Sequence, residues 1–392
     1  MVVDAPVVEK EYSFPIAEYQ ARLSAVQKQM SDRGLDVLLV HTPENIFYLS
    51  GHDTPGYSAY QCLLVARSGE PRLILRNGEI GNAKMFCWLN NLDPYFDLTD
   101  PAENTLVSIG KFGLSGKLRI GIELSSWFLT ARVHVDLQKC LSGHELVDAT
   151  GPVEACRIIK SKAEIECIRQ GVRVAEAGVR AAIEAVEEGK RDNDVAAALN
   201  HAMITAGGEY PAYGPFVALG PVSSIMHGVW KRRVIRKGQC LVLEVGGVYN
   251  RYNGAIMRTV SLGKPSKEVE KIAAAADEMD WAVVDGIGPG VMTADLHGRA
   301  MKAIERHGFG ASRKGRRCGY GIGIAYGPDW GEGHFLSVID NPNTMLKEGM
   351  CLHIPVCIRD LGKAGVGFSE TVVVTKTGYE KLTTLERKLF IR

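Results

Sequence analysis

Apolar residues in the first half of the chain follow two patterns. In residues 16–30 they recur every three or four positions, which is typical of an amphipathic helix, and Gly34 follows as a stop signal. Short apolar runs predict four buried strands, at 37–40, 63–65, 73–75 and 118–122. Strands that alternate with helical stretches predict an α/β domain.

The pattern changes near residue 152. Ser161 and Glu164 have the S-x-x-E spacing of a helix-capping box, and a long amphipathic pattern starting at Ile165 continues to a stop at Gly189. Further helices are predicted at 192–206, 267–284 and 294–307. Strands are predicted at 234–245, 256–261, 350–357 and 371–374. We therefore expect an α+β protein with a smaller α/β domain at 1–152 and a second domain at 153–392.

The composition narrows the class of protein. Of 392 residues, 46% are apolar and 23% charged, and the net charge is +1, so no nucleic-acid or membrane partner is expected. Nine cysteines lack any C-x-x-C pair, and the first twelve residues lack a secretory signal, which favours a reducing, cytoplasmic location. No G-x-G-x-x-G opens a helix after a predicted strand, so no dinucleotide cofactor is expected.

The order of short motifs in the second half resembles the creatinase / methionine aminopeptidase / prolidase superfamily. The matching segments are 157–164, 218–227, 244–259, 319–323, 347–350 and 368–371. This resemblance implies a C-terminal catalytic domain of the pita-bread fold and a small-molecule substrate. It also implies that the N-terminal half is the superfamily's smaller α/β domain.

The resemblance also bears on metal binding. Metallopeptidases of this superfamily hold two metal ions with Asp, Asp, His, Glu and Glu. The corresponding positions here are Glu244, Ala255, Tyr320, Pro355 and Glu370. Alanine and proline side chains offer no donor atom, and a neutral tyrosine is a poor ligand. The resemblance therefore implies that the metal site is lost and that no metal cofactor is used.

A set of acid and base groups remains in this pattern. His227 matches the catalytic histidine of creatinase, the metal-free hydrolase of the superfamily, and histidine side chains suit proton transfer near neutral pH. Glu244 and Glu370 are expected to face the former metal cavity, where two carboxylates could bind a planar amidine or guanidine cation. We take these three residues as the candidate catalytic set.

The sequence is also similar to ectoine hydrolases, a metal-independent branch, in segments 244–258, 319–332, 352–353 and 369–371. Their substrate is a cyclic amidinium that carries a carboxylate. The chain departs from them at Asn253 and in segment 52–60, so a relative of ectoine is also a candidate substrate. In creatinase the segment equivalent to 52–60 reaches the partner subunit's pocket. The resemblance thus implies a homodimer with Tyr57 and Tyr60 as candidate substrate-binding residues.

Each candidate has a structural alternative. His227 could be a structural histidine, Glu244 could pair with Arg251 or Arg258, and Glu370 could form an internal ion pair with an arginine. The remaining candidates are substrate-binding residues or structural ones: Tyr320 as a donor or as filler of the lost-ligand space, His353 as a core residue, and Asp329 and Trp330 as part of a plain turn.

The sequence therefore predicts a metal-independent hydrolase of a non-peptide C–N bond, a cyclic amidine or related amide, in a small zwitterionic metabolite. A metallopeptidase that cleaves Xaa-Pro dipeptides is the first alternative. A non-catalytic ligand-binding protein of the same fold is the second, and a lyase the third.

Overall fold

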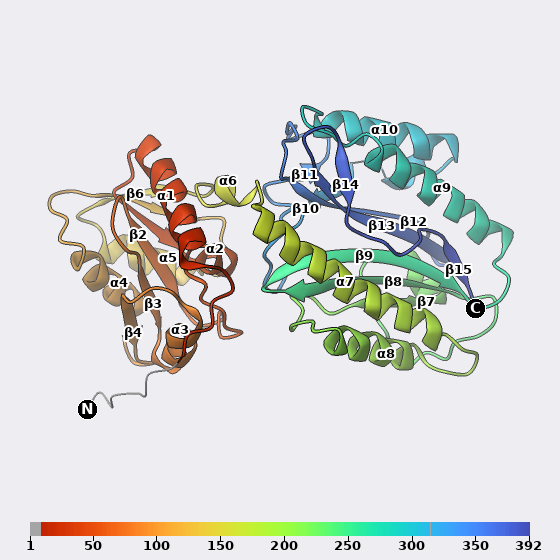
Figure 1. Ribbon diagram of the computed structural model, residues 1–392, viewed down its shortest axis with the longest axis horizontal. Coiled ribbons are helices and arrows are strands. Elements are labelled where there is room, and N and C mark those ends of the chain that lie inside the picture. The colour runs from red at the N-terminus through yellow and green to blue at the C-terminus, as the bar shows by residue number, and fades with distance from the viewer. Residues whose placement is uncertain (1–8, 314) are drawn as a thin grey trace. The chain divides into compact units, whose positions relative to one another are not determined.

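A computed structural model describes residues 9–313 and 315–392. The chain separates into two compact units, Met1–Arg157 and Ile158–Arg392 (Figure 1). The first unit is mixed α/β and the second is α+β, which confirms the predicted fold class. Among the described residues, none of the helices combines the length and apolar character that crossing a bilayer requires.

The first unit is built on a six-stranded mixed sheet with the order β4-β3-β2-β1-β5-β6. Its strands are β1 Val37–Val40, β2 Cys62–Ala66, β3 Arg72–Arg76, β4 Leu92–Tyr95, β5 Arg119–Ile122 and β6 Glu145–Asp148. The central pairs β1–β2 and β2–β3 are antiparallel, and β3–β4, β1–β5 and β5–β6 are parallel. The four predicted strands are all present.

Helices complete this unit. They are α1 Ile16–Asp32, α2 Pro43–Ser50, α3 Ile80–Phe86, α4 Pro101–Gly110, α5 Ala131–Cys140 and α6 Glu154–Arg157. The helix predicted from residue 16 is α1, and its apolar positions Tyr19, Leu23, Val26 and Met30 are buried. Residues of α4 and α5 pack with the apolar side chains of β1, β2 and β5 in one core.

The second unit contains two sheets. One has the order β15-β9-β8-β7 and the other β11-β10-β12-β13-β14. The first comprises β7 Phe216–Leu219, β8 Cys240–Tyr249, β9 Tyr252–Ser261 and β15 Leu389–Ile391. The second comprises β10 Gly319–Gly321, β11 Ser337–Val338, β12 Cys351–Asp360, β13 Ala364–Val374 and β14 Tyr379–Lys381.

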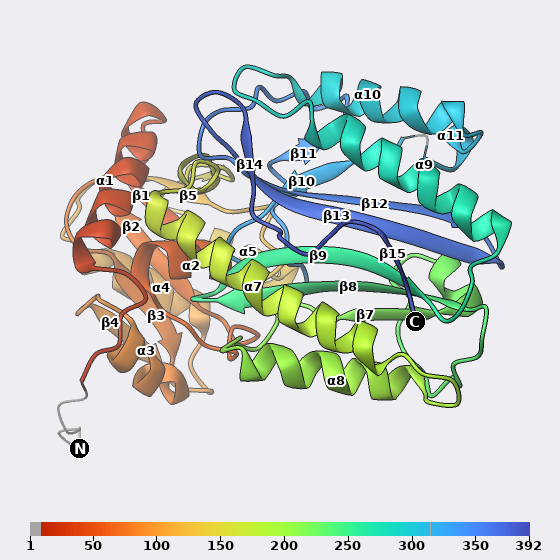
Figure 2. The same cartoon turned by 45° about the vertical axis from the view of Figure 1, so that its right-hand side comes forward.

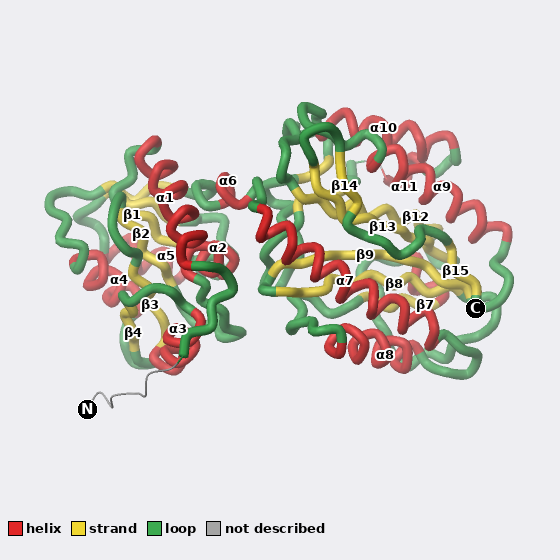
Figure 3. The backbone as a smooth tube through the Cα atoms, in the orientation of Figure 1, coloured by secondary structure: helices red, strands yellow, loops and turns green. Residues whose placement is uncertain are grey.

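Two pairs of helices cover the outer faces of these sheets. The helices are α7 Lys162–Ala185, α8 Asp192–Thr205, α9 Lys267–Val284 and α10 Thr293–Arg306, followed by the short α11 Gly310–Arg313. Helices α7 and α8 lie against the sheet of β7–β9, and α9 and α10 against that of β12 and β13 (Figures 2 and 3). This layering is that of a pita-bread fold.

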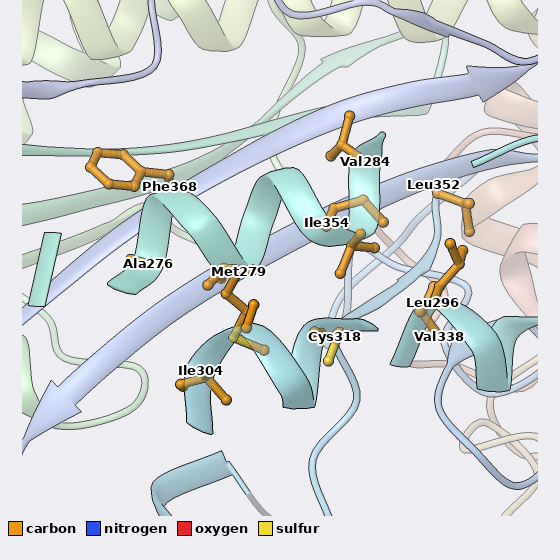
Figure 4. Close-up of a cluster of buried hydrophobic side chains, with 14 of the residues drawn as sticks. Ala276, Met279, Val284, Leu296, Ile304, Cys318, Val338, Leu352, Ile354 and Phe368 are labelled. Carbon is orange, nitrogen blue, oxygen red and sulfur yellow. The ribbon is translucent and has the colours of Figure 1, made fainter. Parts of the chain in front are cut away.

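Each helical pair forms its own apolar core. In the core of α9 and α10, Met279 and Ala276 of α9 pack with Ile354 of β12 and Phe368 of β13 (Figure 4). Because successive side chains of a strand point to opposite faces, the alternate residues of β12 and β13 face the space between the sheets. This alternation decides which polar residues can form a site.

Helix α7 approaches the hairpin of β8 and β9 unusually closely. A Cβ atom added at Gly171 would lie 2.7 Å from the Gly247 carbonyl oxygen, and one at Gly254 would lie 2.2 Å from the Val172 nitrogen. Glycine is needed at these positions because backbone fills the place of a side chain. Ser161 and Glu164 form the predicted capping box at the start of α7.

Several predicted boundaries are wrong. Strand β9 begins at Tyr252 and not at 256, β12 ends at Asp360 and not at 357, and β13 begins at Ala364 and not at 371. The strand expected at 234–245 begins only at Cys240, because the Lys237–Gly238 turn separates it from the single bridge that Val234 makes with Arg191. Helix α7 ends at Ala185, short of Gly189, since Val186 adopts an extended backbone conformation.

Candidate functional site

The candidate site lies between the two sheets of the second unit, on the inner face of β8. Leu243 and Val245 pack into the core with α7 and α8, so Glu244 between them points to the other sheet. Glu244 lies directly opposite Phe216 of β7 and Met257 of β9 in the strand register.

The Glu244 carboxyl group is in an environment that disfavours its charge. Burial raises its pKa to about 7, and the positive charge of Arg359 acts in the opposite direction. At neutral pH the side chain is therefore close to the midpoint of its titration. A bound cation would favour the carboxylate form, because opposite charges attract strongly where water is excluded.

Next to Glu244, Tyr320 of β10 belongs to a chain of hydrogen-bonding side chains. Its hydroxyl oxygen accepts a hydrogen bond of 2.8 Å from the Trp330 indole nitrogen Nε1 and lies 3.0 Å from His353 Nδ1. The other ring nitrogen, Nε2, lies 2.8 Å from the Ser369 hydroxyl. Burial, and next the charge of Glu244, raise the pKa of Tyr320, so its hydroxyl keeps its proton.

His353 is neutral in this chain. Burial, together with the positive charges of Arg317 and Arg258, lowers its pKa to about 3. A neutral imidazole has one donor and one acceptor nitrogen. If Nδ1 accepts, the Tyr320 hydroxyl donates to it. If Nδ1 donates, the Tyr320 hydroxyl is released to donate to a ligand in the site. The tautomer of His353 thus controls whether the Tyr320 hydroxyl can donate a hydrogen bond to a ligand.

His227 contacts Phe216, the residue opposite Glu244 on the neighbouring strand. Its imidazole stacks on Phe216 with ring centroids 5.1 Å apart and planes 18° apart, and the side chain is exposed. The backbone has φ +55°, a left-handed conformation that is uncommon for residues other than glycine. Backbone strain of this kind clusters at functional sites, so the loop conformation supports a functional role for His227.

Aromatic rings connect these groups. Phe216 packs edge-on against Trp330, with centroids 5.5 Å apart, and Tyr213 lies 6.0 Å from the same indole ring. Asp329 holds the turn before this ring, since its Oδ1 accepts hydrogen bonds from the backbone nitrogens of Trp330 and Gly331. Asp329 thus fixes this turn, and Trp330 contacts Tyr320 directly. The predicted contact of both residues with substrate stays a prediction.

The expectation that Glu370 faces the same cavity as Glu244 is wrong. Phe368 and Val372 of β13 belong to the core of α9 and α10, so Glu370 lies on that face and Ser369 faces His353. The partners of the Glu370 carboxylate are Arg258, whose Nη2 is 3.3 Å away, the Thr383 hydroxyl and, at 3.9 Å, the Lys381 amine.

Glu370 therefore forms the internal ion pair with an arginine that was its alternative. Burial raises the pKa of its carboxyl group, which the charges of Arg258 and Lys381 oppose. Burial also lowers the pKa of Arg258. The pair is a structural element of the fold, because each charge compensates the other in an interior that excludes water.

The two tyrosines of the first unit have partners within that unit. The Tyr60 hydroxyl lies 2.7 Å from Thr105 Oγ1, and the Tyr57 ring meets Phe128 edge-on at 5.4 Å. Their predicted contact with substrate in a partner subunit stays a prediction.

The residues present do not fit a pair of divalent ions. Because Glu370 points away from the inner face, Ser369 takes its place there. The five ligand positions are then Glu244, Ala255, Tyr320, Pro355 and Ser369, and Glu244 is the only carboxylate among them. Among residues 9–313 and 315–392, no cluster of three or more His, Cys, Asp or Glu side chains is arranged to hold a metal ion. A paired site needs several anionic oxygen donors around each ion.

Several residues of the site were missed from the sequence. Ser369 could have been found from the alternation of Val366, Phe368 and Val372, whose phase places Glu370 on their face. Phe216 carries no chemical signal of its own, because only strand pairing places it beside Glu244. Arg359 lies beyond the predicted end of its strand, at 357.

The class of protein follows from the two units and the site. A mixed α/β unit precedes a pita-bread unit, and the site lies between the sheets of the latter. Two family models match the chain. "Creatinase/Prolidase N-terminal domain" covers residues 22–159, and "Metallopeptidase family M24" covers residues 166–376. The chain therefore belongs to metallopeptidase family M24, which confirms the superfamily inferred from its motifs.

Individual relatives include more than one activity. The ectoine hydrolase of Halomonas elongata is 30% identical over 98% of this chain and 100% of its own length. The Xaa-Pro dipeptidase of Pyrococcus furiosus is 29% identical over 94% of this chain and 99% of its own. The crystal structure of the prolidase from Pyrococcus horikoshii is 27% identical, with a TM-score of 0.81, and the match covers 94% of this chain and 100% of that one. These relatives are hydrolases.

Proposed function

We propose that this protein is a metal-independent hydrolase of a non-peptide C–N bond in a small zwitterionic metabolite, with a cyclic amidine as the preferred substrate class. The observation that carries the proposal is the place of Glu244: its carboxyl group, whose pKa burial raises, lies on the inner face of β8 opposite Phe216, whose ring packs with Trp330. An amidinium cation supplies the charge that stabilises the Glu244 carboxylate and donates hydrogen bonds to it.

The proposed reaction uses three residues of the chain. His227 removes a proton from a water molecule, whose oxygen attacks the amidinium carbon. Glu244 accepts hydrogen bonds from the amidinium N–H groups. Tyr320 donates a hydrogen bond to the substrate when His353 is in the tautomer that carries its proton on Nδ1. One C–N bond of the resulting tetrahedral carbon then breaks, and the proton held by His227 passes to the departing nitrogen. The products are an amide and an amine, as required for the addition of one water.

The relatives support both this proposal and its main alternative. The ectoine hydrolase relative is named for a cyclic amidine substrate, and the Xaa-Pro dipeptidase relative for a dipeptide. The donor set favours the first, because Ala255, Pro355 and Ser369 replace donors that a two-metal peptidase needs. We therefore place peptidase activity second.

Turnover measured in parallel tests the proposal. Cyclic amidines, creatine-like guanidines and Xaa-Pro dipeptides are each incubated with the protein, once with excess chelator and once with added manganese or zinc. We expect amidine hydrolysis that chelator leaves unchanged, and a His227→Ala variant about 10²- to 10⁴-fold slower in kcat. Dipeptide cleavage that appears only with metal would establish the alternative. Tight retention of amidine without product, equal in the variant, would establish a binding protein.

Two further properties belong to the same proposal. No disulfide links the nine cysteines, all of which lie in the described ranges, and seven are buried. This fits a reducing compartment, and we propose the cytoplasm. We also propose a homodimer, in which Tyr57 and Tyr60 of one copy would reach the site of the other. Sedimentation analysis of the purified protein tests the second point.

A further inference from the structure

A cavity that the proposed reaction does not use lies beside the site. Its volume is about 340 Å³, enough for a small metabolite. Its lining combines two arginines with apolar side chains: Arg316 and Arg359, with Ile225, Met226, Leu361, Cys357 and Ser224. A small apolar cavity with two cations is suited to a compact anion that has a hydrocarbon part.

The strands place this cavity next to Glu244. Arg359 and Cys357 have the same strand parity as His353 on β12 and so share its face, toward the space between the sheets. The charge of Arg359 acts on the Glu244 carboxyl, and Met226 directly precedes His227 in the chain. The cavity therefore adjoins the region of Glu244 and His227, because its lining includes Arg359 and Met226.

The guanidinium group of Arg359 has few hydrogen-bond acceptors among the described residues. Its Nε is buried and makes no hydrogen bond to the described residues, and its Nη1 makes a long one of 3.4 Å to the Cys357 carbonyl oxygen. The neighbouring Asp360 pairs instead with Lys363. A buried N–H of a guanidinium without an acceptor costs free energy, and a carboxylate restores two parallel hydrogen bonds.

We infer that Arg359, assisted by Arg316, binds the carboxylate of the substrate in this cavity, with the adjoining carbon atoms against Ile225, Met226 and Leu361. The inference rests on the proposed function and deepens it: the substrate is a zwitterion whose cationic end meets Glu244 and whose anionic end meets Arg359. Opposite charges on the two sides of the site thereby fix which carbon faces His227.

A matched pair of ligands tests this subsite. The probes are 2-methyl-tetrahydropyrimidine-4-carboxylate (ectoine) and its neutral 4-carboxamide, with affinity measured by calorimetry and turnover measured separately. We expect the protein to prefer the carboxylate roughly 10- to 100-fold in Kd. Arg359→Gln removes that preference by weakening carboxylate binding alone, and Arg316→Gln reduces it less.

The control is Lys363→Gln, which removes the same charge from the turn after β12 but outside the cavity. It should keep the full carboxylate preference. Equal affinity of the unaltered protein for the two probes, no binding of either, or an Arg359→Gln variant that keeps the preference would overturn the subsite. A carboxylate preference that depends on Arg359, without turnover of either probe, would leave the subsite standing and refute only the proposed hydrolysis.

Discussion

At the scale of single residues, the chemistry concentrates on Glu244. Its carboxyl group lies among aromatic side chains and near one arginine, so burial dominates its pKa. A raised pKa means that the folded protein binds a proton that the unfolded chain releases. The ionised Glu244 side chain thus lowers the stability of the folded protein, and a bound cation would offset this loss. Titratable groups with such shifted pKa values are common at functional sites.

Glu244→Gln tests this cost. The pKa of Glu244 is about 7 in the folded state and near 4.5 in the unfolded chain, so its contribution makes the protein less stable as pH rises from about 5 to 7. Glutamine resembles the neutral form and avoids the penalty. We expect the variant to be more stable than the parent at pH 8, by up to about 3 kcal/mol, and nearly equal to it at pH 4.5.

Urea unfolding at the two pH values measures the difference. The variant should also lose cation binding at both. A variant less stable than the parent at pH 8 would show that Glu244 has a stabilising ionic partner in the fold.

At the scale of elements, β13 shows how one strand serves two purposes. Its inner face carries Ser369, which bonds to His353 and accepts a hydrogen bond from the backbone nitrogen of Met257. Its outer face carries Glu370, which compensates Arg258. Neighbouring polar residues therefore belong to different networks, one of the site and one of the interior.

Substitution of the two neighbours should separate these networks. Glu370→Gln leaves the buried Arg258 without its counter-charge, so we expect a loss of about 3–5 kcal/mol in unfolding free energy with ligand affinity retained. Ser369→Ala removes the partner of His353 Nε2 and should lower kcat with a smaller effect on stability. Denaturant unfolding and steady-state kinetics measure both. If Glu370→Gln instead lowered ligand affinity or kcat, and Ser369→Ala mainly lowered stability, Glu370 would belong to the site.

The contact between α7 and the β8–β9 hairpin offers a second test at this scale. Gly171→Ala would place its Cβ against the Gly247 carbonyl oxygen, and we expect a loss of about 1–3 kcal/mol or more. Gly298→Ala in α10 is the matched control, since a Cβ there meets no atom within 4 Å. That change should stabilise by about 1 kcal/mol, because alanine favours a helix more than glycine does. Thermal unfolding distinguishes the two, and equal effects would refute the close contact.

At the scale of the whole molecule, the question is what charge fills the space between the two sheets. The donor atoms there do not suit paired divalent ions, so metal should not contribute to stability. A ligand that binds only the folded state raises Tm, and above Kd the rise grows with the logarithm of the ligand concentration. We expect Mn²⁺ or Zn²⁺ at up to millimolar concentration, and excess chelator, to leave Tm unchanged. A rise in Tm with metal that chelator reverses would show an ion in the fold.

Much of this architecture could be predicted from sequence. Periodic apolar positions gave α1 and α7 to α10 within a few residues, since a helix with one buried face must repeat its apolar residues every three or four positions. The order of motifs gave the superfamily. The same reasoning failed between 234 and 239, where Val234 and Ile235 precede a turn and β8 begins only at Cys240. Local composition does not show which backbone groups find hydrogen-bond partners.

The sequence by itself determined the two-domain plan, the superfamily and the loss of donor atoms at Ala255 and Pro355, because these depend on residue identity and order alone. Only the tertiary structure decided which side chains meet. It separated Glu370 from Glu244, joined Tyr320, His353 and Ser369 in one chain, and set Arg359 beside Glu244. The physical reason is that strand parity and sheet pairing between distant segments fix where a side chain points, and burial then sets its charge.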